Sequence, residues 1–140
     1  MAIPNPKFED SYGRLFGPDI ALQKSADDFF YRFYERFLKS DEIAALFRAT
    51  DMDRQVQMLK RSLVNLVAYY VTGEPGTDLT RIAQLHQRLR VKPQMYERWL
   101  LALVETVLEF DPQADEETRL AWCWAMSPGI TYMRLAGTAR

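Results

Sequence analysis

The 140-residue sequence lacks several features on which common functional sites depend. It has one cysteine, Cys123, so it can build neither an internal disulfide nor a cysteine-rich metal or iron–sulfur site. No apolar run reaches the roughly 18 residues that a membrane span requires. The first residues also lack the charged and then apolar pattern of a signal peptide. We therefore expect a cytoplasmic protein that does not use a membrane as its partner.

The sequence also has no excess of either charge. Its 18 Lys and Arg residues are interspersed with 19 Asp and Glu residues, which gives a net charge of −1. Nucleic-acid binding requires a basic stripe or patch, so we expect no nucleic-acid partner. Aromatic residues, in contrast, make up 13% of the chain. Aromatic rings bury large areas and line cavities that accept flat ligands, so this content favours a protein with such a cavity.

Apolar residues recur at intervals of three and four almost throughout, which is typical of amphipathic helices, and no useful length alternates with period two. We therefore predict an all-α fold in a single domain over residues 1–140. Residues 1–7 should be loose, because Pro4 and Pro6 oppose regular structure. The segment Gly17–Pro18 should end the first helix early, and Pro128–Gly129 should kink or shorten the last one. The predicted helices cover about 8–16, 19–39, 43–47, 51–72, 78–91, 93–110 and a segment that begins near 115.

The single histidine, His86, lies on the apolar face of a short predicted helix, together with Ile82 and Leu89. Such a residue can be a core histidine whose ring bonds to a nearby carbonyl group. A neutral imidazole in an apolar site lined by aromatic residues is also what haem iron needs as its protein ligand. The position alone does not separate these two interpretations.

The residues that follow His86 carry a resemblance to a known family. Lys92 and Pro93 stand six and seven positions after the histidine, and Tyr96 stands three positions after the proline. This segment resembles the proximal segment of bacterial globins, including the globin domains of flavohaemoglobins and of globin-coupled sensors. In those proteins a haem-ligating histidine is followed by Lys-Pro and Tyr at the same spacing.

Further blocks of sequence agree with this resemblance. The segment 33–37, which contains Tyr34, and the later Phe47 look like the distal tyrosine helix of those globins and the phenylalanine that stacks on the porphyrin, with one deletion relative to flavohaemoglobins. The segment 50–55, which ends in Gln55, is similar to the start of the distal helix in several bacterial and truncated globins, where a leucine follows four residues later, here Leu59. Ala121–Trp122 is a weaker match in the last helix. The resemblance spans roughly residues 20–134.

The resemblance implies a globin-like helical sandwich around one haem b, the iron protoporphyrin IX group, with His86 as the proximal iron ligand. Phe47 would stack on the ring, and Tyr34 and Gln55 would donate hydrogen bonds to a gas ligand. A second alignment, on residues 68–69, puts Met58 and Ser62 where Gln55 and Leu59 otherwise stand. All four positions share one helix face, so each is a candidate pocket residue.

Three more residues are candidates for the proximal side of the pocket. Tyr96 resembles a flavohaemoglobin residue near the histidine, although a tyrosine here suits core packing equally well. Val91 and Trp99 fit either a pocket wall or the core. Basic residues at 88, 90 and 92 suit haem propionates, although solvated surface charge is the default interpretation.

The resemblance implies reversible binding of O2, CO and NO, in a monomer or a weak homodimer. NO dioxygenation with an external reductase as electron donor remains open. Flavohaemoglobins place a glutamate in the last helix beside the proximal histidine, and the aligned region here has no acid in place. That difference favours ligand binding over dedicated catalysis. The alternative is a haem-free globin-fold module that acts by protein contacts as a sensor or regulator.

Overall fold

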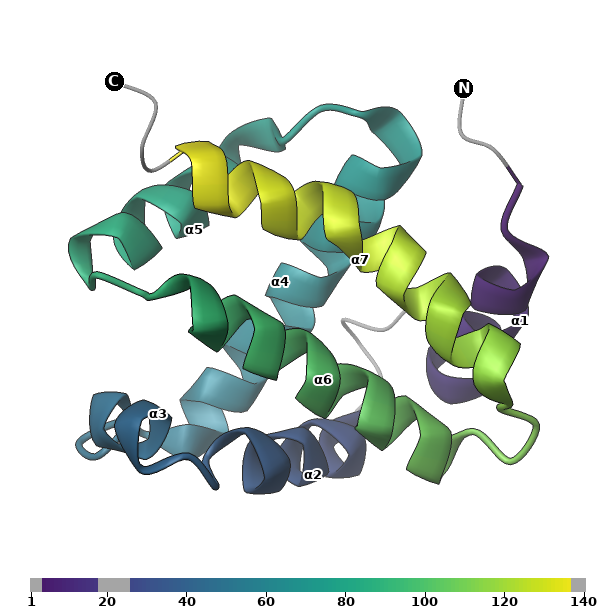
Figure 1. Ribbon diagram of the computed structural model, residues 1–140, viewed down its shortest axis with the longest axis horizontal. Helices are drawn as coiled ribbons and strands as arrows, with labels where there is room; N and C mark the ends of the chain where they lie inside the picture. Colours follow the sequence, from purple (N-terminus) through teal and green to yellow (C-terminus); the bar gives the residue numbers. More distant parts are fainter. Residues whose placement is uncertain (1–3, 18–25, 137–140) are drawn as a thin grey trace.

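The computed structural model describes residues 4–17 and 26–136, and this part of the chain consists of helices and connecting turns (Figure 1). No described helix combines the length and the apolar character needed to cross a bilayer. The helices, in chain order, are α1 (Pro6–Phe16), α2 (Asp27–Phe37), α3 (Asp41–Leu46), α4 (Met52–Thr72), α5 (Gly76–Arg88), α6 (Pro93–Phe110) and α7 (Glu116–Ala136). The prediction of an all-α fold is confirmed.

Helix α7 is the element against which most of the others pack. It contacts α1, α4, α5 and α6, while α2 packs on α6 and on α4. Figure 1 shows α6 and α7 as two long neighbouring helices, with α2 and α3 beyond α6. Large side chains that are fully buried come from several of these helices, among them Trp122, Phe30, Phe33, Leu103 and Met126. The core is therefore shared between helices that are distant in sequence.

Short local signals set most helix ends. The Asp51 carboxylate accepts hydrogen bonds from the backbone N–H groups of Asp53 and Arg54 and so caps the start of α4. Gly73 ends α4 in the left-handed conformation, with φ of 77°. Pro93 occupies the first turn of α6, where its missing N–H has no helical partner to lose.

The structure corrects the prediction for the first residues and resolves the one for the last helix. Helix α1 begins at Pro6, so Pro6 and Lys7 are helical rather than loose, because proline suits a first helical turn. Residues 1–3 and 18–25, which include the start of the predicted second helix, lie outside the described part. The predicted kink at Pro128–Gly129 is confirmed, since α7 bends near its middle (Figure 1), but the helix is not shortened there and runs on for eight further residues to Ala136. One proline removes one helical hydrogen bond, and the packing of both halves of α7 outweighs that loss.

Close packing continues beyond the proline in α7. Gly129 is buried, and a Cβ atom at that position would overlap the side chain of Leu66 on α4. The absence of a side chain therefore lets the backbones of α4 and α7 approach each other at this point.

A partly buried ion pair joins α1 to the residue that ends α6. The Arg14 guanidinium donates from Nε and Nη2 to the two carboxylate oxygens of Asp111, at 2.8 Å each. The Asp111 side chain is completely buried, while 27% of the Arg14 side chain is exposed. The Arg14 hydrogen bonds are the main cause that lowers the pKa of Asp111 from 3.8 to about 2, although burial opposes this shift.

Replacing Asp111 with asparagine should lower the free energy of unfolding at pH 7 by about 1–3 kcal/mol, because the Arg14 guanidinium loses its charged partner at a buried position. Urea unfolding followed by circular dichroism measures this change. Since the pKa of Asp111 is lowered in the folded state, its contribution is present above pH 3.8 and is lost as the pH falls through about 2. The difference between D111N and the native protein should therefore shrink over that range. Glu35→Gln, at the exposed pair with Arg32, is the control and should cost less than about 1 kcal/mol.

Candidate functional site

The imidazole of His86 is half-buried on α5 and has a fixed orientation. Its Nδ1 lies 2.8 Å from the backbone carbonyl oxygen of Ile82, one turn earlier on the same helix. Burial lowers the pKa of His86, which the bond to Ile82 opposes, so the neutral ring is favoured. A neutral ring has one N–H, and a carbonyl oxygen can only accept, so the proton belongs on Nδ1. The lone pair of Nε2 is then available to a ligand or a metal.

The end of α5 fixes the chain that follows His86. Arg90 has φ of 57°, the left-handed conformation that usually favours glycine. Its N–H donates to the Gln87 carbonyl at 3.1 Å, and the N–H of Val91 donates to the His86 carbonyl at 3.2 Å. This pair of bonds is a Schellman motif, in which the residue after the left-handed one returns to the last helical turn. Val91 is thereby held next to the turn that carries His86, and its side chain is half-buried.

Tyr96, on the first turns of α6, lies beside the histidine as a packing partner. The two ring centroids are 6.2 Å apart with an angle of 29° between the ring planes. Burial raises the pKa of Tyr96, so its hydroxyl stays protonated. The acceptor for the histidine proton is the carbonyl of Ile82, which the sequence did not single out. Every residue has a backbone carbonyl, so the residue types alone do not identify this acceptor. The spacing of four residues on one helix could have pointed to the Ile82 carbonyl.

Three elements bring Tyr34, Phe47 and Gln55 together. Tyr34 is buried on α2, and Phe47 follows the end of α3. The Phe47 ring meets the Tyr34 ring edge to face, with centroids 5.8 Å apart. Gln55 on α4 donates from Nε2 to the Tyr34 hydroxyl oxygen at 3.1 Å. Burial is the main cause that raises the pKa of Tyr34 to about 12, so the hydroxyl keeps its proton.

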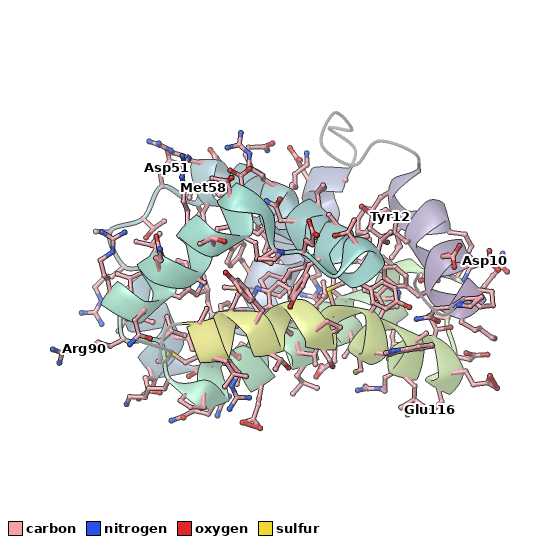
Figure 2. All side chains as sticks on the ribbon, turned by 90° about the horizontal axis from the view of Figure 1, so that it is seen from above. Asp10, Tyr12, Asp51, Met58, Arg90 and Glu116 are labelled. Carbon is pink, nitrogen blue, oxygen red and sulfur yellow. The ribbon has the colours of Figure 1, made fainter. Side chains whose placement is uncertain are left out.

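The other candidates on α4 lie in different surroundings. Leu59 is buried in the core, whereas about half of the Met58 side chain is exposed, and Figure 2 shows it at the outer surface near Asp51. The Ser62 hydroxyl donates to the Met58 carbonyl of its own helix at 3.0 Å. The described contacts therefore join Gln55, and neither Met58 nor Ser62, to Tyr34. On α6, half-buried Trp99 packs against Phe33, with ring centroids 5.7 Å apart.

An apolar stripe flanks the histidine on α5. Leu85 and Leu89 lie within one turn of His86, and each has more than two fifths of its surface exposed. Leu79 and Ala83, on the adjoining face of the helix, are buried in the core. The protein therefore covers only part of the apolar surface beside the imidazole. Such a surface suits an apolar ligand.

A structure comparison links this arrangement to a known protein. The chain is 34% identical to a protein of Pseudomonas aeruginosa PAO1 whose crystal structure is described as structurally highly homologous to a human haemoglobin. The match has a TM-score of 0.78 and covers 94% of this chain and 96% of the other. This chain belongs to the globin family. No protein-family model and no curated protein sequence matches it.

The globin fold agrees with the resemblance drawn from the sequence. In this globin the lone histidine lies on α5, the tyrosine on α2 and the glutamine on α4, which are the elements on which the sequence placed them. Helix α4, which carries Gln55 of the Tyr34 group, packs against both α2 and α5. The candidate residues thus form two groups, one around His86 and one around Tyr34.

Arg90 gives a test of the turn that follows α5. Replacing Arg90 with glycine should raise the free energy of unfolding by about 1 kcal/mol, because the left-handed conformation no longer opposes a side chain. The matched control is Arg88→Gly, two residues earlier in the last helical turn, which should lower it by about 1 kcal/mol. Urea unfolding of both variants measures the two changes. A loss for R90G as large as that for R88G would show that the Arg90 side chain itself stabilises the turn.

Proposed function

We propose that this globin binds one haem b through Nε2 of His86 and that the haem protein reversibly binds O2, CO and NO. The observation that carries the proposal is that the neutral, half-buried ring of His86 uses Nδ1 for its bond to the Ile82 carbonyl, at 2.8 Å, and so keeps Nε2 for a metal. An imidazole ligand of haem iron needs this tautomer and a hydrogen-bond acceptor for its other nitrogen, which fixes the orientation of the ring.

The residues around His86 fit a porphyrin rather than a bare metal ion. His86 is the single histidine of the chain, and one imidazole suits a metal that brings its other ligands with it. Leu85 and Leu89 offer apolar surface on the histidine side. Phe47, in edge-to-face contact with Tyr34, offers an aromatic surface in the other group. A flat apolar ring would cover surface that the protein leaves partly exposed.

Tyr34 and Gln55, the proposed distal pair, support gas binding through the direction of the hydrogen bond between them. When bound, haem supplies an iron coordination position that a diatomic gas can occupy. Because Gln55 donates to the Tyr34 oxygen, the hydroxyl hydrogen of Tyr34 is free to donate elsewhere. A donor in a buried site of low dielectric stabilises partial negative charge on a ligand better than water does. This supports the alignment that places Gln55, and not Met58, in the distal pocket.

The proximal bond favours ligand binding over oxidative catalysis. The acceptor for His86 is a neutral carbonyl, whereas a carboxylate acceptor would make the imidazole a stronger electron donor. NO dioxygenation with an external reductase therefore stays a secondary activity in this proposal.

The central test is haem uptake by the purified protein and by His86→Ala. The native protein should be red, with an intense Soret band, whereas H86A should lose its haem to a scavenger apoglobin at least about tenfold faster, because a ligand bond is removed. Gln84→Ala, at an exposed position on the same helix, is the matched control and should retain haem normally. A native protein that is colourless and cannot take up added haemin would sink the proposal and favour the haem-free interaction module.

The distal assignment is tested by the O2 dissociation rate. Tyr34→Phe keeps the ring that packs on Phe47 but removes the donor, so the rate should rise about tenfold or more, as expected for one hydrogen bond to a partly charged group. Met58→Leu is the control and should leave the rate within about twofold, since its side chain is half exposed. Stopped-flow measurement compares them. An unchanged rate in Y34F with a raised rate in M58L would favour the alternative alignment.

A further inference from the structure

Helix α3 is the least anchored helix of the described structure. It has six residues, and Ile43 is its single buried one. Ile43 lies outside the main hydrophobic core, and Leu46 in the last turn has 49% of its surface exposed. The close helix pairs of the described part join the other six helices to one another and do not include α3. A segment with so few buried apolar contacts opens at a lower free energy than the core around it.

One ion pair ties α3 to the loop between α5 and α6. Lys92 Nζ lies 2.8 Å from Oε2 of Glu42, in the first turn of α3. Lys92 follows Val91 and directly precedes α6, so it belongs to the segment that is held next to His86. Figure 1 shows α3 and this loop at the same end of the molecule. The pair therefore joins the helix before Phe47 to the segment after His86.

The position of Phe47 depends on α3. The N–H of Phe47 donates to the Ala44 carbonyl of α3 at 3.1 Å, so the backbone of Phe47 moves with the helix. Phe47 is also the ring that packs on Tyr34 and that we assign to the porphyrin. A displacement of α3 would therefore carry an aromatic wall away from the proposed haem site.

We propose that α3 is a movable lid on the proposed haem site and that the Lys92–Glu42 ion pair holds this lid closed. The inference rests on the proposed function, because it concerns how firmly the haem bound through His86 is retained. With the ion pair formed, Phe47 keeps the position described above. Without it, α3 opens more often and haem leaves more readily. An exposed ion pair contributes little, so its loss should increase opening by about two- to fivefold.

Glu42→Gln and Lys92→Gln test the lid by the rate of haem loss. Each removes the ion pair, so haem should pass to a scavenger apoglobin about two- to fivefold faster than from the native protein. The charge exchange, E42K with K92E, should restore a rate close to the native one. Unchanged rates in both E42Q and K92Q would overturn the proposal.

Lys7→Gln is the matched control for the loss of an exposed ion pair. The pair of Lys7 with Asp115 has a distance of 3.0 Å and side-chain exposures of 49% and 53%, close to the 54% and 49% of Lys92 and Glu42. It lies between α1 and the residue that precedes α7, so K7Q should leave haem loss at the native rate. An equal acceleration in K7Q would show that the effect is not specific to α3 and would contradict the lid.

Haem dimethyl ester separates the lid from a direct contact between Lys92 and a haem propionate. The ester lacks both propionate charges, so a direct contact would make K92Q harmless with the ester. It would also make E42Q retain haem more firmly, because Lys92 would be released from Glu42. The lid instead requires that both variants lose haem and its ester faster than the native protein does. A K92Q effect that vanishes with the ester would overturn the proposal and assign Lys92 to a propionate.

Hydrogen exchange of the purified native protein and of E42Q measures the lid without relying on haem. The amide of Ala44, which donates to the Ser40 carbonyl at 2.8 Å, and the amide of Phe47 report on α3. Both should exchange about two- to fivefold faster in E42Q, while amides in the middle of α6 keep their native rates. Failure of the native protein to take up haem would contradict the proposed function. Normal haem uptake with unchanged exchange in α3 would contradict the lid.

Discussion

The hydrogen bond from Nδ1 of His86 to the carbonyl of Ile82 determines what the imidazole can do. It lies within α5, so it needs no other element to be in place, and it leaves a half-buried histidine as a base with one free nitrogen. The Schellman motif after the helix uses the carbonyl of the same histidine to hold Val91. The ring nitrogen and the backbone carbonyl of His86 are thus both held by hydrogen bonds at the end of α5. The proposed proximal site depends on this local geometry.

The Tyr34 group is built in a different way. Its three residues come from α2, from the residue after α3 and from α4, so it exists only when those elements have packed. The two groups also differ in their partners, since a backbone carbonyl fixes the histidine, while a side-chain amide fixes the tyrosine. A substitution in the core between α2 and α4 should therefore disturb the Tyr34 group more than it disturbs the orientation of His86.

Local chemistry in the sequence predicted the helices well and their ends less well. Glycine and proline marked the breaks after α4 and before α6, because backbone conformation alone sets them. Proline misled at Pro6, which suits a first helical turn, whereas the kink expected at Pro128 is present and long-range packing lets the helix continue beyond it. For the site, the family resemblance supplied the candidate residues, and the structure added their contacts. The Ile82 carbonyl and the left-handed conformation of Arg90 depend on backbone geometry, which residue types did not reveal.

Pro128 divides α7 into two halves that contact different helices. Before the proline, Trp122 donates from its indole nitrogen to Ser11 of α1, and the Ala121 carbonyl accepts from Asn5. After it, Gly129 lies against α4, and Tyr132 shares a hydrogen bond with Thr80 of α5. The bend lets one continuous helix follow a curved body and clamp the first helix and the histidine-bearing helix at once. A straight α7 could not keep its contacts with both α1 and α5. The bend near Pro128 therefore determines how these two helices are held.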